Sequence, residues 1–120
     1  MRYGSAALSG AALVAAFLFV NPVAPATVTP KRIEIVTKRF AFNPAEITLK
    51  KGDPVVLVFR SADVVHGIKF KELNIQTEIH KEAPSELSFT PQAAGDFVGH
   101  CSRFCGAGHG SMTLTLHVTE

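Results

Sequence analysis

The stretch Asp96-Phe-Val-Gly-His-Cys-Ser-Arg-Phe-Cys-Gly-Ala-Gly-His-Gly-Ser-Met-Thr-Leu-Thr-Leu-His-Val118 decides the fold of this chain. Residues 96–101 and 112–118 have the short, apolar-rich character of two β-strands. From Cys101 to Met112 the chain carries two thiols, an imidazole and a thioether. A soft donor set of this kind selects copper, zinc or iron–sulfur over hard cations. The stretch therefore predicts two strands joined by a metal-binding loop.

The donor types narrow the choice of metal to copper. A structural zinc site wants four strong nitrogen or sulfur donors, and a Met is not among them. One Cys, two His and a distant axial Met form the mononuclear copper site of electron-transfer proteins. Cys105, His109 and Met112 supply all of these except one His. His66 is the natural supplier of the other imidazole, because it follows the apolar run 55–59 by a short turn.

Cys101 is left over from such a mononuclear site. A second thiolate so close to Cys105 can bridge to another copper, which favours a binuclear centre with two bridging thiolates. A disulfide is the structural alternative for two cysteines in an exported protein, but a bridge between residues four apart closes a small loop and gains little. A mononuclear blue or red copper site, in which one cysteine is dispensable, is the nearer alternative.

The order of these donors resembles the binuclear CuA domain of cytochrome c oxidase subunit II, a cupredoxin. The resemblance covers residues 33–118 and includes the stretches 42–53 and 63–67. It implies that the thiolates bridge two coppers, with His66 and Met112 on one and His109 on the other. The full ligand set implied by the resemblance is His66, Cys101, the backbone carbonyl of Arg103, Cys105, His109 and Met112. Oxidase members often have Glu where this chain has Arg103, so the resemblance leaves the tuning of the site open.

The rest of the chain after the N-terminal segment shows short β patterns divided by turn residues. No run of ten or more residues there has helical periodicity. We expect one edge strand with an irregularity over 33–42, followed by strands at 47–49, 55–59, 66–70, 75–79, 86–89, 96–101 and 112–118. These patterns predict an all-β sandwich or barrel, and the resemblance adds a Greek-key cupredoxin sandwich.

The N-terminal residues 1–26 have the pattern of a secretory signal peptide. Arg2 gives a positive start, residues 11–20 form an apolar core, and Ala24-Pro-Ala26 is a small-residue cleavage signal. An uncleaved anchor is the alternative, although a spanning helix needs about 20 mainly apolar residues. Residues 27–31 are predicted to be a linker and 32–120 the folded domain. Both alternatives place that domain in the periplasm or another extracytoplasmic space, with membrane contact only through an uncleaved segment.

Charge and motifs exclude several classes of function. Removing residues 1–26 takes away Arg2 and no acidic residue, so the 12 basic residues of the chain fall to 11 against 10 acidic ones. The basic residues occur as dispersed doublets, which argues against a nucleic-acid partner. The chain has no nucleophile elbow, phosphate loop or HExxH motif, so nothing indicates an enzyme. We expect His80 and His117 to lie on the surface, and His100 to lie either on the surface or beside the ligands.

The sequence therefore predicts an exported electron carrier that passes one electron through a binuclear copper centre. The resemblance implies haem-protein partners such as a cytochrome c or a terminal oxidase. A copper-handling protein without redox turnover is the alternative of another class. Sco-type copper chaperones also carry Cys-x3-Cys and a His, but their fold is thioredoxin-like and their His lies far downstream.

Overall fold

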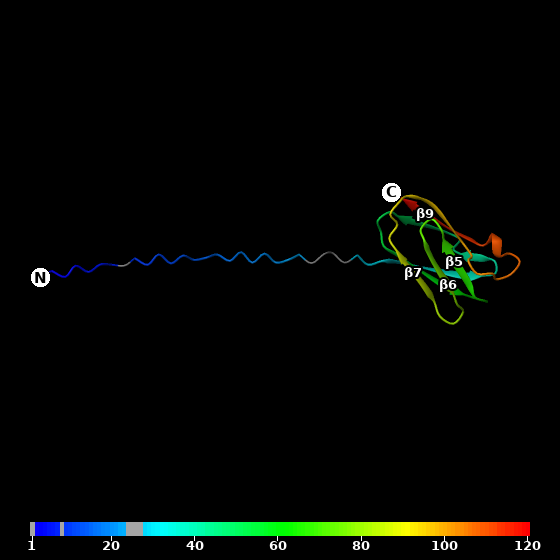
Figure 1. Cartoon of the computed structure of the whole chain (residues 1–120), viewed down its shortest axis with the longest axis horizontal. Helices are drawn as coiled ribbons and strands as arrows, with labels where there is room; N and C mark the ends of the chain where they lie inside the picture. Colours follow the sequence, from blue (N-terminus) through cyan, green and yellow to red (C-terminus); the bar gives the residue numbers. More distant parts are fainter. Residues whose placement is uncertain (1, 8, 24–27) are drawn as a thin grey trace.

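The computed structural model describes residues 2–7, 9–23 and 28–120, and its regular structure is a β-sandwich (Figure 1). A short 3-10 turn, η1 (His109–Ser111), lies just before the last strand. The strands are β1 (Lys31–Lys38), β2 (Ala41–Asn43), β3 (Glu46–Lys50), β4 (Val55–Ser61), β5 (His66–Phe70), β6 (Ile75–Ile79), β7 (Ser85–Phe89), β8 (Gly95–His100) and β9 (Thr113–Thr119).

The strands form two sheets whose neighbours are mostly distant in sequence. One sheet has the order β2-β1-β4-β7 and the other the order β3-β9-β8-β5-β6. β1 runs parallel to β4, and β3 runs parallel to β9. The chain crosses from one sheet to the other between β2 and β3, β3 and β4, β4 and β5, β6 and β7, and β7 and β8. The predicted all-β sandwich is confirmed.

Alternation of apolar and polar residues places the core between the sheets. In β9, Leu114, Leu116 and Val118 are buried, while the residues between them are partly exposed. β3 has the same pattern, whereas β4 is buried continuously from Val55 to Phe59. Successive side chains of a strand point to opposite faces, so the alternation shows which faces of β3 and β9 meet the core, while β4 is covered on both faces.

The N-terminal edge of the first sheet differs from the prediction. We expected one irregular edge strand over 33–42, but the chain turns at Arg39 and Phe40, and β1 and β2 pair as an antiparallel hairpin. β2 is the edge strand, and β1 lies inside the sheet between β2 and β4. Phe42 is buried, while Phe40 sits in the turn and is 40% exposed. Buried side chains of both β1 and β2 therefore face the core, although a turn separates the two strands.

The described residues before β1 form no helix or strand, and 9–23 lie away from the sandwich (Figure 1). Across residues 2–7, 9–23 and 28–120, the structure contains no helix with the length and apolarity needed to cross a membrane. The predicted cleavage boundary after Ala26 lies outside the described residues. β1 begins at Lys31, the last residue of the predicted linker.

Candidate metal centre

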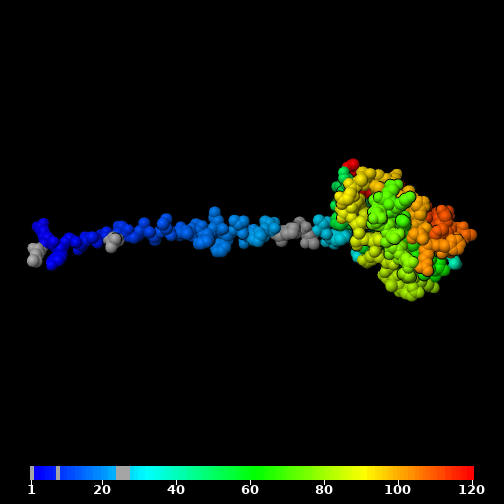
Figure 2. All heavy atoms as spheres, in the orientation of Figure 1, coloured from blue at the N-terminus to red at the C-terminus, as the bar shows by residue number. Residues whose placement is uncertain are grey.

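The predicted ligands lie at the end of the sandwich opposite to Lys31. Cys101 directly follows β8 and Met112 directly precedes β9, so the cysteine loop (residues 101–112) joins two paired strands. His66 begins β5 and comes at the end of the histidine loop (residues 62–66). The cysteine loop forms a cap at this end of the molecule, where Figure 2 shows it in orange. The ends of the strands therefore determine where the cysteine loop and the histidine loop begin.

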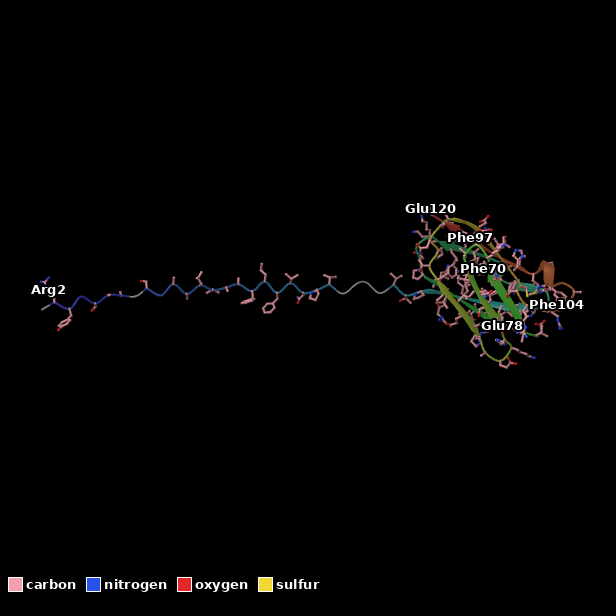
Figure 3. The ribbon with its side chains drawn as sticks, in the orientation of Figure 1. Arg2, Phe70, Glu78, Phe97, Phe104 and Glu120 are labelled. Carbon is pink, nitrogen blue, oxygen red and sulfur yellow. The ribbon has the colours of Figure 1, made fainter. Side chains whose placement is uncertain are left out.

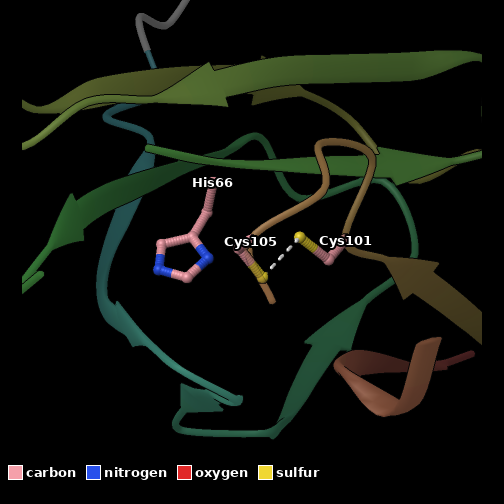
Figure 4. A group of neighbouring side chains, drawn as sticks. All are labelled: His66, Cys101 and Cys105. Atoms are coloured by element: carbon pink, nitrogen blue, oxygen red, sulfur yellow. Dashed lines mark hydrogen bonds between the residues drawn. The ribbon is translucent and has the colours of Figure 1, made fainter. Parts of the chain in front are cut away.

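Three soft donors converge in a buried space between these loops (Figure 4). A ring nitrogen of His66 and the sulfurs of Cys101 and Cys105 all lie within 4.8 Å of one another. The two sulfurs are 3.9 Å apart and both thiols are free. All three residues are buried, His66 completely. One imidazole and two thiols in a shielded space form a donor set that suits copper.

The other predicted ligands lie around the same sulfurs. Met112 Sδ is 3.4 Å from Cys105 Sγ, and Met112 is buried. His109 Nδ1 is 3.9 Å from Cys105 Sγ. The backbone carbonyl of Arg103 accepts a hydrogen bond from the Cys101 thiol at 3.2 Å. The structure therefore brings the six predicted groups together, and their roles as ligands stay a prediction.

The two ring nitrogens of His66 differ in their surroundings. Nε2 lies 2.7 Å from Asp63 Oδ1. Nδ1 is buried and has no hydrogen-bond partner among the residues that the structure describes. Figure 4 shows one ring nitrogen facing the sulfurs and the other turned away. A buried nitrogen without a partner is costly, and a metal at this place would satisfy it. The His66 ring therefore fits a metal ligand whose other nitrogen is held by a carboxylate.

Asp63 is strongly held as a carboxylate. Although burial alone would raise its pKa, hydrogen bonds from the Arg39 N–H (2.8 Å), from His66 and from the Val64 N–H (2.6 Å) lower the pKa of Asp63 to about 2. An ionised Asp63 accepts a hydrogen bond from the Nε2–H of His66. In the neutral imidazole with this tautomer, Nδ1 carries no proton and can bind a metal.

In the metal-free protein the pKa of the Cys105 thiol is raised, whereas that of Asp63 is lowered. Burial raises the pKa of its thiol to about 11, the adjacent Cys101 adds to the rise, and the Arg39 cation opposes it. The Cys105 thiol is therefore protonated at neutral pH. Metal binding requires thiolates, so loading the site must release this proton.

Arg39 and Phe40, in the turn between β1 and β2, are contacts of the site that sequence reasoning missed. Arg39 Nε donates a hydrogen bond to the Cys105 carbonyl at 2.7 Å. The Phe40 ring lies so close to Gly106 and Gly108 that a Cβ on either glycine would come within 3 Å of it. Both residues lie more than 60 positions before the cysteine loop. The pairing of the strands brings Arg39 and Phe40 into contact with the cysteine loop.

The outer surface of the cysteine loop carries an aromatic ring beside a charged network. Phe104 is 76% exposed, and its ring centroid is 5.7 Å from that of His109. The Arg103 guanidinium binds Glu78 at 2.7 Å, and Glu78 also contacts His80. Figure 3 shows Phe104 at the tip of the molecule, with Glu78 on a neighbouring part of the same end. Both Arg103 and Phe104 are exposed.

The remaining histidines lie where the sequence placed them. His80 and His100 are exposed. His100 adjoins Cys101, but Cys101 is buried and His100 faces outward. His117 is partly exposed, and its hydrogen bonds to Asp96 (2.7 Å) and Glu46 (3.3 Å) raise its pKa. The predicted surface positions are confirmed.

Comparisons with known proteins agree with this arrangement. Residues 10–114 match the family described as cupredoxin-like domain. The chain is 28% identical over 88 residues to cytochrome c oxidase subunit 2 of Thermus thermophilus, a match that covers 73% of this chain and 65% of that protein. With a second Thermus thermophilus sequence of the same subunit, the match covers 52% of the relative. The chain therefore spans between about half and two-thirds of the length of these relatives.

Solved structures share the fold. The periplasmic domain of cytochrome oxidase subunit II (CoxB) of Bradyrhizobium japonicum superposes with a TM-score of 0.69 at 17% identity, over 75% of this chain and 84% of that one. The metal-binding domain of the Cu(I)-exporting P-type ATPase CopA of Streptococcus pneumoniae D39, solved with Cu(I), has a TM-score of 0.62 at 27% identity, over 74% and 85%. The predicted resemblance to oxidase subunit II is confirmed, and the chain belongs to the cupredoxin-like domain family.

Proposed function

We propose that this protein is an electron carrier that binds copper at His66, Cys101, Cys105, His109, Met112 and the Arg103 carbonyl. The observation that carries the proposal is the buried convergence of one imidazole and two thiols, with Nδ1 of His66 lacking any other partner among the described residues. Copper, when bound, supplies a one-electron couple. The residues of the chain bind it, shield it and fix its surroundings.

The fold supports rapid electron transfer because the donors are placed before metal binds. His66 is oriented by Asp63, and the cysteine loop is held at both ends by the paired strands β8 and β9. A site that changes little between redox states needs such a rigid scaffold. Loops at the end of a rigid sandwich are the usual place for functional groups.

Two coppers are favoured over one by the arrangement of the sulfurs. Cys101 and Cys105 face the same space, 3.9 Å apart, and each has a further predicted ligand beside it. The Arg103 carbonyl lies next to Cys101, while Met112 and His109 lie next to Cys105. This distribution supports two metals bridged by both thiolates, as the relation to oxidase subunit II suggests. A mononuclear site would leave one buried thiol unused.

The proposed setting follows from the relatives. A haem protein such as a cytochrome c, or a terminal oxidase, would exchange electrons with the site, and the protein would act outside the cytoplasm. The CoxB domain that shares this fold is described as periplasmic. We assign no enzymatic reaction to the chain itself.

Metal stoichiometry and electron paramagnetic resonance test the proposal. Purified protein reconstituted with copper should bind two ions per chain and turn purple in the mixed-valence state. A single copper with a four-line hyperfine signal would replace the binuclear centre with the mononuclear alternative. Absence of copper binding would contradict the whole proposal.

A second candidate function is copper handling without redox turnover. The likeness to the Cu(I)-bound domain of CopA favours it, because that relative belongs to a copper exporter and shares 27% identity with this chain. Cyclic voltammetry separates the two functions. A carrier should cycle reversibly between its redox states without losing metal, whereas a copper-handling protein should hold Cu(I) and release it when oxidised or when offered a Cu(I) acceptor.

A further inference from the structure

The turn between β1 and β2 contacts both loops that carry the predicted ligands. The backbone N–H of Arg39 donates to Asp63 Oδ2 in the histidine loop at 2.8 Å. The side chain of the same residue donates to the Cys105 carbonyl in the cysteine loop at 2.7 Å. Asp63 in turn holds His66. One residue thus connects the two halves of the site by hydrogen bonds that do not pass through the metal.

Phe40 adds a steric contact with the cysteine loop. A Cβ at Gly108 would lie 2.4 Å from Phe40 Cγ, and a Cβ at Gly106 would lie 2.8 Å from Cε1. Contacts this short are essentially never found in proteins, so the ring is seated directly on the loop backbone. Rotation about χ2 leaves Cγ in place, so a ring flip cannot relieve the contact at Gly108. The cysteine loop can therefore follow its present path only if both positions that face Phe40 are glycine.

We propose that Arg39 and Phe40 are positioning residues that clasp the cysteine loop against the histidine loop and hold the donors in place before metal binds. This inference rests on the copper site proposed above. Arg39 holds the Cys105 carbonyl and Asp63 in place through its hydrogen bonds. The Phe40 ring sets the position of the loop backbone at Gly106 and Gly108 by steric contact. The turn contributes no ligand, and its effect on copper passes through the geometry of Cys105 and His66.

Gly108 allows a sharp test of the steric contact. Its φ is −88°, a value that alanine adopts without strain, so Gly108→Ala introduces only the clash with Phe40. Gly106 is unsuitable because its φ of +141° disfavours any side chain. Gly110 is the matched control, since a Cβ there meets nothing within 4 Å. Phe40 is 40% exposed, so Phe40→Ala removes little of the core.

The measurement is Cu(I) affinity in competition with a chelator, with the visible spectrum recorded for each variant. Gly108→Ala should lower the affinity by about 10-fold to 100-fold, as loss of an outer support typically does, and should shift the absorption bands. Gly110→Ala should stay within about twofold of the wild type. In Phe40→Ala/Gly108→Ala the methyl group has space, so this double variant should bind no more weakly than Phe40→Ala alone. Equal Cu(I) affinities of Gly108→Ala and Gly110→Ala would overturn the proposed role of Phe40. So would a double variant whose loss of affinity equals the product of the losses in Phe40→Ala and Gly108→Ala.

Arg39 provides an independent variant should Gly108→Ala fail to fold. Arg39→Gln should weaken copper binding and shift the spectrum, and Arg39→Lys should restore part of both because it keeps a cationic donor. Arg32→Gln removes an exposed cation, paired with Glu86, from the strand that precedes this turn and is the control. If Arg39→Gln behaves like Arg32→Gln, the clasp is rejected.

Failure of the proposed function is recognised separately. Wild-type protein that binds no copper would reject the copper site, and the clasp would then be judged on the metal-free protein by amide hydrogen exchange. The N–H groups of His109, Ser111 and Met112 donate within the loop. They should exchange faster in Gly108→Ala than in Gly110→Ala. Equal exchange rates would reject the clasp whatever the wild type binds.

Discussion

At the scale of single residues, a carboxylate orients the imidazole of His66, a proposed copper ligand. Its Nε2 is taken by Asp63, and its Nδ1 is buried without a partner in the described part of the chain. Asp63 also accepts the backbone N–H groups of Arg39 and Val64. One side chain therefore sets the tautomer of the imidazole and joins the β1–β2 turn to the histidine loop.

Asp63 should make the stability of the metal-free protein depend on acid pH. Its pKa is about 2 in the folded protein against 3.8 without the fold, so the unfolded chain binds more protons between these values. Its stabilising contribution is complete above the unfolded pKa and is lost as the pH falls through about 2. The difference in unfolding free energy between wild type and Asp63→Asn should therefore narrow on acidification, by at most about 2 kcal/mol.

Urea unfolding followed by circular dichroism at a series of pH values checks this prediction. Asp53→Asn removes an exposed carboxyl from the turn before β4 and serves as the matched control. Wild-type and Asp63→Asn curves that stay parallel down to about pH 2 would contradict the role of Asp63.

The two cysteines should not be equivalent. Cys105 contacts Met112 and His109 as well as Cys101, whereas Cys101 contacts the Arg103 carbonyl and Cys105. Cys101→Ser should abolish the binuclear centre and leave at most one copper on Cys105, His66 and His109. Cys105→Ser should bind copper more weakly still. Metal analysis with electron paramagnetic resonance decides, and a Cys101→Ser protein that retains two coppers would refute the bridging role.

That the candidate ligands lie together could be predicted from sequence, but the residues that support them could not. Cys101, Cys105, His109 and Met112 are close in the chain, so their spacing alone indicates a metal loop. Asp63 lies three residues before His66, which is a weak signal by itself. Arg39 is 24 positions from Asp63 and 66 from Cys105, and such contacts depend on how distant strands pair.

At the scale of elements, the hairpin of β1 and β2 is the part that sequence reasoning described wrongly. The strand pattern was readable because apolar residues alternate, yet the segment Lys38-Arg39-Phe40-Ala41 contains no Gly, Pro, Asn or Asp to mark a turn. The other strands have clear turn residues or alternation, and their predicted positions agree with the structure to within a few residues. Pairing partners, such as the parallel alignment of β1 with β4, required the structure.

Within β1, Thr37 offers a test of core packing. Its side chain is completely buried, and among the described residues its Oγ1 has no hydrogen-bond partner. A buried hydroxyl without a partner is destabilising, and valine has nearly the same shape. Thr37→Val should therefore raise the free energy of unfolding of the metal-free protein by about 1 kcal/mol.

Chemical denaturation compares Thr37→Val with Thr48→Val, a control on the exposed side of β3. The control should change the unfolding free energy by no more than about 0.5 kcal/mol. A Thr37→Val protein less stable than the wild type would mean that the hydroxyl has a partner, such as an ordered water.

At the scale of the whole molecule, we predict that the N-terminal segment directs the sandwich out of the cytoplasm. If residues 1–26 are a signal peptide, the mature protein should begin at Thr27 and be released by osmotic shock. N-terminal sequencing of the released protein checks the boundary. Large residues at Ala24 and Ala26 should block cleavage, because the signal requires small side chains there. Recovery of wild-type protein in washed membranes with residues 1–26 intact would identify an anchor instead.

The direction of β1 gives the molecule two opposite poles. Lys31, at its start, binds the Pro54 carbonyl at one end of the sandwich, and the turn after Lys38 touches the cysteine loop at the other end (Figure 1). Eight strand residues separate these points by about 25 Å. Protein fixed to an electrode through its N-terminal residues would present the donors to the solution and keep them far from the conductor. Attachment beside Phe104 would reverse this orientation, so the choice of attachment point decides whether a current flows directly or needs a soluble mediator.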